Sequence, residues 1–133
     1  MQTYALGIPI MQRDMDLIRT LMLKLEADDR LIGAELIQFS PQDLGLDNSR
    51  RDEIIYHLGL LIGAGFLRGV RYDAHLMPTV SEITWDGQEF LANIKDENIW
   101  ARTKEKAKEI PGISLKIIAE IAESLIRAHF HLP

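Results

Sequence analysis

Residues 54–69 read IIYHLGLLIGAGFLRG, an apolar segment that changes character at its glycines. Apolar side chains recur every three or four positions, which predicts one face of a helix. We expect this helix to cover 49–64, with Ser49 as its N-cap and Gly65 as its C-cap. FLRGVRY at 66–72 then predicts a strand. The predicted core face of the helix consists of Ile54, Ile55, Leu58, Leu61 and Ile62.

The segments on either side extend this order of elements. Apolar spacing predicts a first helix over 14–28, whereas 31–39 is compatible with a short strand or a partial helix. ITW at 83–85 predicts a strand that returns after a loop or hairpin tip. Further helices are predicted at 86–94, with the apolar set Trp85, Phe90, Leu91 and Ile94, at 97–109, and at 114–128, where apolar residues cover most of the circumference.

Helix, turn, helix, hairpin and further helix is the order of a winged-helix domain. The predicted fold class is therefore α+β, a winged helix-turn-helix with a C-terminal helical extension. We expect an N-terminal extension at 1–13, a winged-helix domain at 14–94, and C-terminal helices at 95–133 within the same compact unit. The segment 31–48 has to supply the middle helix, although its helical pattern is weak.

The composition is typical of one globular domain and excludes several classes of site. The chain has 133 residues, 47% of them hydrophobic and 26% charged, and no cysteine, which excludes a disulfide framework and a thiolate site. The N-terminus lacks the basic region of a signal peptide. The longest dense apolar run, 58–67, is about half the length of a membrane span. We expect a cytoplasmic protein that does not enter the membrane.

The charge is acidic overall but unevenly distributed. The formal net charge is −5, which argues mildly against a nucleic-acid partner. Residues 49–72, however, contain four arginines against two carboxylates, a net charge of +2. This segment includes the apolar stretch quoted above.

Two motifs resemble known winged-helix proteins. YHLGLLIGAGFL at 56–67 resembles the junction between recognition helix and strand in many winged-helix regulators, and ITWDGQEFL at 83–91 resembles the segment after their wing. With MQRDMDLIR at 11–19 and SLKIIAEIA at 114–122, they resemble a bacterial and prophage-associated family known as a domain of unknown function.

That resemblance covers about residues 11–128. It implies a winged-helix fold and an association with mobile elements, and it implies no established activity and no catalytic residues. Members of the family typically begin at the position of Met11, so residues 1–10 are expected to be an upstream start or an added segment.

Duplex DNA is the candidate partner of the 49–72 segment. Arginines at the start of its helix and in the strand after it could contact phosphates, whereas carboxylates, glycines and Leu60 on the outward face offer little base readout. The candidate nucleic-acid-binding residues are Arg50, Arg51, Tyr56, His57, Arg68 and Arg71. His75 could add a backbone contact from the wing. The alternative is that these arginines are solvated surface residues with no binding role.

Other candidate sites have simpler interpretations. His57 follows Glu53 by four residues, which favours a hydrogen bond over an acid–base pair, because no nucleophile accompanies them. Gly59 and Gly63 would allow another helix to approach closely. His129 and the nearby His131 provide too few ligands for a metal site. We expect no catalytic residues, no metal, no cofactor and no small-molecule substrate.

The C-terminal helices have two interpretations. They could form a homodimer, which we favour as the oligomeric state, or pack back on the first helix. The predicted function is a non-enzymatic DNA-binding transcriptional regulator or accessory factor of bacterial or phage origin. The alternative is a winged-helix protein–protein interaction module that does not bind DNA.

Overall fold

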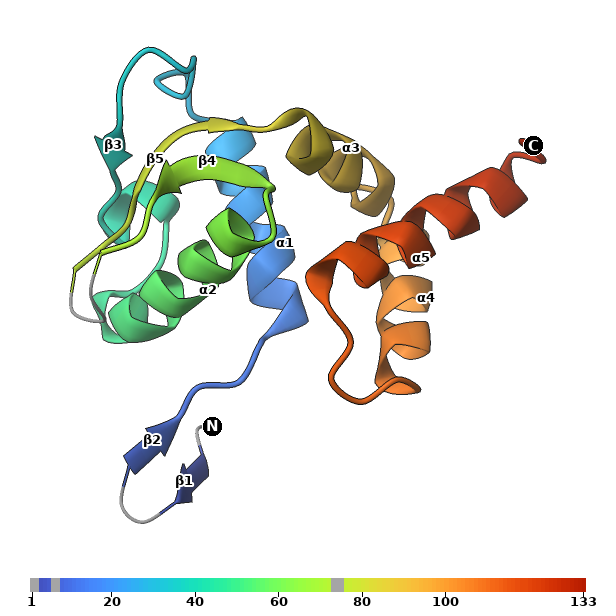
Figure 1. Ribbon diagram of the computed structural model, residues 1–133, viewed down its shortest axis with the longest axis horizontal. Coiled ribbons are helices and arrows are strands. Elements are labelled where there is room, and N and C mark those ends of the chain that lie inside the picture. Colours follow the sequence, from blue (N-terminus) through green and yellow to red (C-terminus); the bar gives the residue numbers. More distant parts are fainter. Residues whose placement is uncertain (1–2, 6–7, 73–75) are drawn as a thin grey trace.

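The computed structural model describes residues 3–5, 8–72 and 76–133, with side chains from Met11 onward (Figure 1). The elements are β1 (Thr3–Ala5), β2 (Ile8–Ile10), α1 (Met15–Glu26), β3 (Ile37–Gln38), the 3-10 turns η1 (Gln42–Leu44) and η2 (Asn48–Arg50), α2 (Arg51–Gly63), β4 (Leu67–Val70), β5 (Thr79–Ile83), α3 (Trp85–Ile94), α4 (Glu97–Lys108) and α5 (Leu115–His129). The fold is α+β, and its order of elements is compatible with a winged helix.

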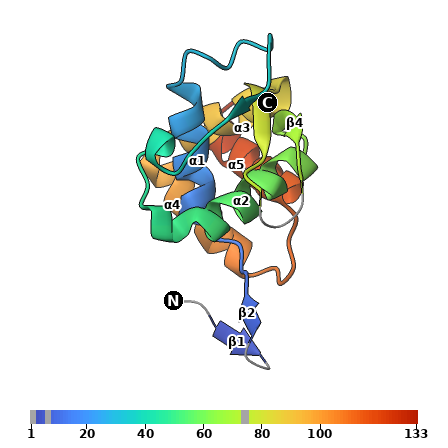
Figure 2. The same cartoon turned by 90° about the vertical axis from the view of Figure 1, so that its left-hand side faces the viewer.

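The three central strands form one antiparallel sheet in the order β3–β5–β4 (Figure 1). Ile37 pairs with Val80, and Leu67 pairs with Ile83. A bulge separates Arg68 from Gly69, where a Cβ atom would lie 2.2 Å from the Thr79 carbonyl oxygen. Only glycine permits this close approach of the two strands. Strands β1 and β2 pair separately and project from the body of the molecule (Figures 1 and 2).

Local capping chemistry sets the start of four helices. The side chains of Asp14, Thr84, Asp96 and Ser114 each accept a hydrogen bond from the backbone N–H three residues further on. These bonds satisfy donors that have no partner within the helix. Helix α2 is the exception. Its N-cap is Arg50, without a side-chain cap, because η2 begins one turn earlier and is capped by Asp47. The prediction that Ser49 is the N-cap of this helix is therefore wrong.

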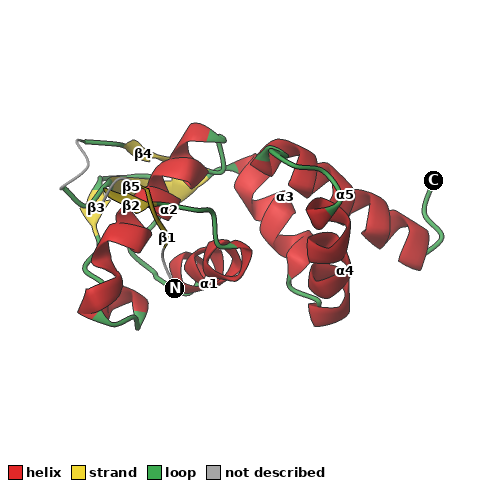
Figure 3. Cartoon of the chain, turned by 90° about the horizontal axis from the view of Figure 1, so that it is seen from below, coloured by secondary structure: helices red, strands yellow, loops and turns green. Residues whose placement is uncertain are grey.

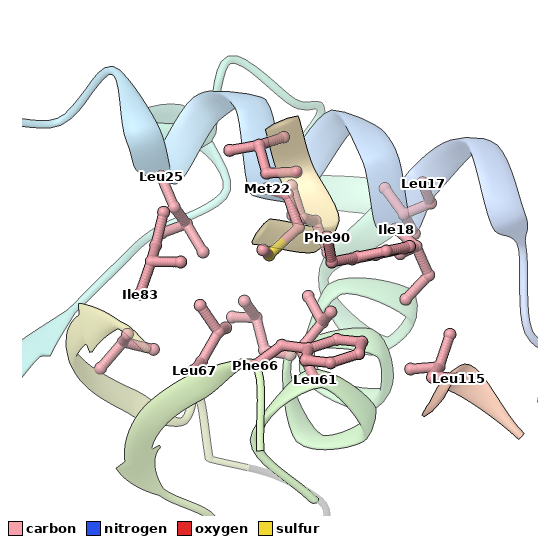
Figure 4. Close-up of a cluster of buried hydrophobic side chains, with 14 of the residues drawn as sticks. Leu17, Ile18, Met22, Leu25, Leu61, Phe66, Leu67, Ile83, Phe90 and Leu115 are labelled. Carbon is pink, nitrogen blue, oxygen red and sulfur yellow. The ribbon is translucent and has the colours of Figure 1, made fainter. Parts of the chain in front are cut away.

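One hydrophobic core joins the sheet to the helices. Figure 4 shows residues of α1 facing those of α2, β4 and α3, with Phe66 beside Phe90. The same cluster includes Ile113, Leu115, Ile118 and Ala122 from the C-terminal part. Helix α4 also contacts α1 through a hydrogen bond from Trp100 Nε1 to Asp16 Oδ1 at 2.9 Å. Helix α4 therefore contacts the first helix, as one of the two interpretations expected, whereas α5 packs mainly against α3 and α4.

Helix α5 is buried mainly along one face. Leu115, Ile118, Ala122 and Leu125 are buried, whereas Ile117 is 45% exposed. Apolar residues cover most of the circumference of this helix, yet those outside this face are exposed or only partly buried. Figure 3 shows α3, α4 and α5 at one end of the molecule, with the end of α5 extending beyond the other two.

Two segments differ from the sequence-based prediction. The segment 31–48 supplies a two-residue strand and one complete 3-10 turn, so the middle helix of a helix-turn-helix is reduced to η1. The returning strand lies at Thr79–Ile83 rather than at 83–85. Trp85 begins α3 and is 74% exposed, so its assignment to the apolar set of that helix is wrong. Among the described residues, no helix is long and apolar enough to cross a membrane.

Candidate nucleic-acid interface

The candidate residues come from α2 and from the strand that follows it. Gly65, with φ of +82°, reverses the chain after α2, and the Phe66 N–H donates to the Leu61 carbonyl oxygen at 3.0 Å. The chain then enters β4, which packs beside α2 (Figure 1). This tight junction brings side chains from the end of β4 back towards the exposed side of the helix.

Arg71 is the clearest case. Its guanidinium lies over Gly59, where a Cβ atom would come within 2.6 Å of Arg71 Nε, and passes Gly63, where a Cβ atom would lie 3.9 Å from Nη1. Gly59 is buried as a result, although it belongs to the face that was expected to point outward. The approach that these glycines permit is therefore that of an arginine rather than that of another helix.

Two other arginines form ion pairs within the molecule. Arg50 Nη2 lies 3.2 Å from Glu53 Oε2 and 3.8 Å from Asp14 Oδ2. Arg68 on β4 pairs with Glu82 on the neighbouring strand. Exposed ion pairs of this kind contribute about 0–1 kcal/mol to folding stability, so a phosphate can compete with the carboxylate for the guanidinium. The carboxylates nevertheless reduce the positive potential of the surface.

Arg51 occupies the start of α2, beside the hairpin formed by β4 and β5. It is half-buried and lines a shallow hollow of ≈ 370 Å³ together with Asp43, Asn48 and Leu76. The dipole of the helix favours an anion near its first turn, although the Arg51 N–H itself donates to the Asn48 carbonyl oxygen. Asp52, in the same turn, partly opposes that effect.

His57 is not on the surface, and its expected contact with DNA is wrong. The side chain is only 1% exposed, and its ring forms an edge-to-face contact with Tyr56 at 5.3 Å. The Asp14 N–H donates to Nε2 at 2.7 Å, and Nδ1 donates to the Glu53 carbonyl oxygen at 2.7 Å. The histidine therefore links the start of α1 to α2 as a neutral imidazole, and its partner on Glu53 is the backbone rather than the carboxylate.

Burial lowers the pKa of the His57 imidazole below its ordinary value, although the Glu53 carbonyl and the nearby carboxylates oppose the shift. Protonation would also place a second N–H on Nε2, directly facing the N–H of Asp14. The folded protein therefore resists a proton that the unfolded chain binds at a pH near 6.5.

This difference predicts a pH-dependent stability. Above a pH of about 6.5, His57 is neutral in both the folded and the unfolded state. Below that pH the unfolded state binds more protons, so the free energy of unfolding should decrease as the pH is lowered. The loss is at most about 1.4 kcal/mol per pH unit. Urea unfolding between about pH 7.5 and 5 measures it.

His57→Gln provides the test of this assignment. Its amide can donate to Glu53 and accept from Asp14, so the variant should fold and lose most of the slope in this pH range. His129→Gln, at an exposed histidine, should retain the slope. An unchanged slope in His57→Gln would show that another group binds the proton.

Two candidate residues, Tyr56 and His75, remain. Tyr56 is half-buried on α2, and His75 lies outside the described residues.

Among the described residues, no group of three or more His, Asp or Glu side chains could hold a metal ion. Sequence reasoning missed the contact between Arg71 and Gly59, because nothing local links a glycine to an arginine twelve residues later.

Comparison with known proteins identifies a family without naming an activity. Residues 12–114 match the family described as "Hypothetical protein (DUF2513)". An uncharacterized protein from Haemophilus influenzae is 30% identical over 120 residues, covering 87% of this chain and 96% of that protein. No solved structure matches the chain. The chain therefore belongs to the DUF2513 family, a domain-of-unknown-function family, as the sequence motifs indicated.

Proposed function

We propose that the protein is a winged-helix protein that binds duplex DNA, as a cytoplasmic regulator or accessory factor of bacterial or phage origin. The order α1–β3–η1–α2–β4–β5, with β5 between the other two strands, supports the winged-helix assignment. Helix α2 takes the place of the recognition helix, and the hairpin formed by β4 and β5 takes that of the wing. The proposed role is binding rather than catalysis.

The observation that carries the proposal is the position of Arg71 over Gly59. In that position a cation from the β4–β5 hairpin lies against α2, whose first turn contributes Arg51. Arg71 beside this helix and Arg51 in its first turn are suited to phosphate contact, while Asp52 and Tyr56, on the same stripe of α2 as Gly59, offer little base readout. We therefore propose binding that depends on the DNA backbone and on salt, with weak dependence on base sequence.

Fluorescence anisotropy with a random-sequence duplex, at low and at physiological salt, tests the proposal. Binding should weaken steeply as salt rises, and Arg51→Ala and Arg71→Ala should each reduce the slope of log K against log salt by about one. Lys106→Ala on α4 removes the same charge away from the interface and should leave the slope unchanged. Absence of binding at low salt would rule out the proposal.

Glycine variants test the position of Arg71 without removing its charge. Gly59→Ala would place a methyl group against the flexible end of Arg71, so the arginine should move aside and DNA affinity should fall. Folding stability should hold or rise, because alanine favours a helix by up to about 1 kcal/mol over glycine. Gly63→Ala is the matched control, since its Cβ atom would make only ordinary contact with Arg71.

A second candidate is a protein-interaction module without DNA binding. Val70, Tyr72 and Leu76 flank the hairpin tip and are 40–48% exposed, and the ion pairs of Arg50 and Arg68 reduce the positive potential. An apolar wing would suit a protein surface better than a phosphate backbone. Protein that folds normally and fails to bind DNA at low salt would favour this candidate.

A further inference from the structure

Helix α5 presents apolar and small side chains outside its buried face. Ile117, Ile121, Ser124 and Ala128 follow one another at intervals of four, three and four residues, which places them on one stripe of the helix. Ile121 is half-buried, and the other three are exposed. The stripe, which we call the α5 seam, adjoins the face that packs against the rest of the molecule.

Exposed apolar residues also precede and follow the seam along the chain. Ile110 precedes α5 and is 48% exposed, whereas Phe130 and Leu132 follow it and are 61% and 52% exposed. Figures 1 and 3 show that the C-terminal end of α5 extends away from α3 and α4, so the described part of the chain leaves it uncovered. A surface of this kind usually marks an interaction site.

We propose that the α5 seam binds a second copy of this chain, with the two α5 helices antiparallel across a two-fold axis. In this arrangement Ile121 opposes the partner's Ser124, and Ile117 opposes the partner's Ala128. Each large side chain thus meets a small one, as interdigitated packing between helices requires. The partner's Phe130 and the partner's Leu132 then lie beyond Ile117, towards the start of α5.

Charge complementarity specifies the same arrangement. Glu120 and Arg127 lie two helical turns apart on the same edge of the seam. An antiparallel pair brings Glu120 opposite the partner's Arg127, and the two-fold axis repeats the contact at the other end. Arg127 donates three hydrogen bonds, to Glu123 and to the Pro133 carbonyl oxygen, which leaves two guanidinium N–H groups for this contact.

A second copy explains these features better than an unrelated partner does. The large residues occur in the N-terminal half of the seam and the small ones in the C-terminal half, and along one edge the acidic Glu120 precedes the basic Arg127 in the same way. A surface that complements its own reversed copy is what an isologous dimer requires. The proposal concerns α5 alone, so it holds or fails independently of DNA binding by α2.

Sedimentation equilibrium of the full chain over a range of concentrations tests the proposal. The wild-type protein should approach twice its mass of 15.2 kDa. Glu120→Arg places like charges opposite each other at both ends of the seam and should weaken dimerisation on the order of tenfold to a hundredfold. Adding Arg127→Glu exchanges the partners of both ion pairs and should restore the dimer.

Two further variants complete the experiment. Glu35→Arg reverses an exposed charge in the loop before β3, which lies on the opposite side of the molecule from α5 (Figure 1), and should not change the dissociation constant. Ile117→Asp changes a partly exposed side chain, so it should retain the circular dichroism of the monomer and weaken the dimer on the order of a hundredfold or more. A wild-type protein that stays monomeric at every concentration, a dimer insensitive to Glu120→Arg, or a double variant that stays monomeric would each overturn the proposal.

Discussion

Gly87→Ala should lower the free energy of unfolding by roughly 3 kcal/mol. A Cβ atom at this position would lie 2.0 Å from the Phe66 carbonyl oxygen and 2.8 Å from Ile83 Cγ2. The obstacle is backbone, so the helix as a whole would have to shift rather than one side chain. The gain in helix propensity, at most about 1 kcal/mol, cannot offset that shift.

Hydrogen bonds on both sides of Gly87 leave little room for such a shift. The Thr84 N–H donates to the Phe66 carbonyl oxygen at 3.1 Å, and the Thr84 hydroxyl donates to the Gly65 carbonyl oxygen at 2.6 Å. The same hydroxyl accepts the Gly87 N–H at 3.1 Å as the N-cap bond of α3. Moving α3 outward would therefore strain or break the contacts that hold it beside the end of α2.

Urea unfolding followed by circular dichroism measures the change, with Gly63→Ala as the control. That variant introduces the same methyl group at the end of α2, where it meets only Arg71 at 3.9 Å, and it should be neutral or stabilising. Equal stability of Gly87→Ala and the wild-type protein would show that α3 does not pack this closely on Phe66.

The helices could be predicted well because their signals are local. The prediction of 14–28 is confirmed by Met15–Glu26, and those of 97–109 and 114–128 by α4 and α5. Periodic apolar residues and a capping side chain within one turn suffice for such elements. The strand β5 was placed too late, because ITW carries β-forming residues, whereas pairing with β3 and β4 selects Thr79–Ile83.

The candidate interface depends on contacts that no local pattern contains. His57 is buried, and its ring accepts a hydrogen bond from the backbone N–H of Asp14, 43 residues earlier in the chain. Arg68 is paired across the sheet with Glu82, and Arg71 reaches α2 through the turn at Gly65. Net charge and residue type predicted which side chains could bind phosphate. Only the tertiary structure shows which of these side chains already contact other parts of the protein.

Phe90→Ala should destabilise the protein by about 3–5 kcal/mol, because it removes a large side chain from the core and leaves a cavity that the surrounding side chains cannot close. Phe90 is 1% exposed and stacks on Phe66, with ring centroids 4.9 Å apart and planes inclined by 22°. Figure 4 shows it between α1 and β4, with Leu115 of α5 nearby. The cavity would thus open where the sheet and the C-terminal helices share their core.

The same variant tests whether the C-terminal helices unfold together with the rest. Trp100 is 4% exposed in α4, whereas Trp85 is 74% exposed, so a Trp85→Phe background leaves Trp100 fluorescence as a probe of the C-terminal part. In that background, Phe90→Ala should shift the urea midpoints from fluorescence and circular dichroism by the same amount. Tyr72→Ala, which removes an aromatic ring that is 48% exposed, should shift neither appreciably.

Unequal midpoints would contradict this expectation. If Trp100 fluorescence kept its wild-type midpoint while circular dichroism lost part of its signal early, residues 95–133 would form a separate unit. The hydrogen bonds of Arg19 to the carbonyl oxygens of Ile94 and Lys95, at 2.9 and 2.8 Å, argue against that outcome. They hold the end of α3 against α1, and the hydrogen bond from Trp100 Nε1 to Asp16 Oδ1 holds α4 there, so α4 cannot detach without breaking a contact to the first helix.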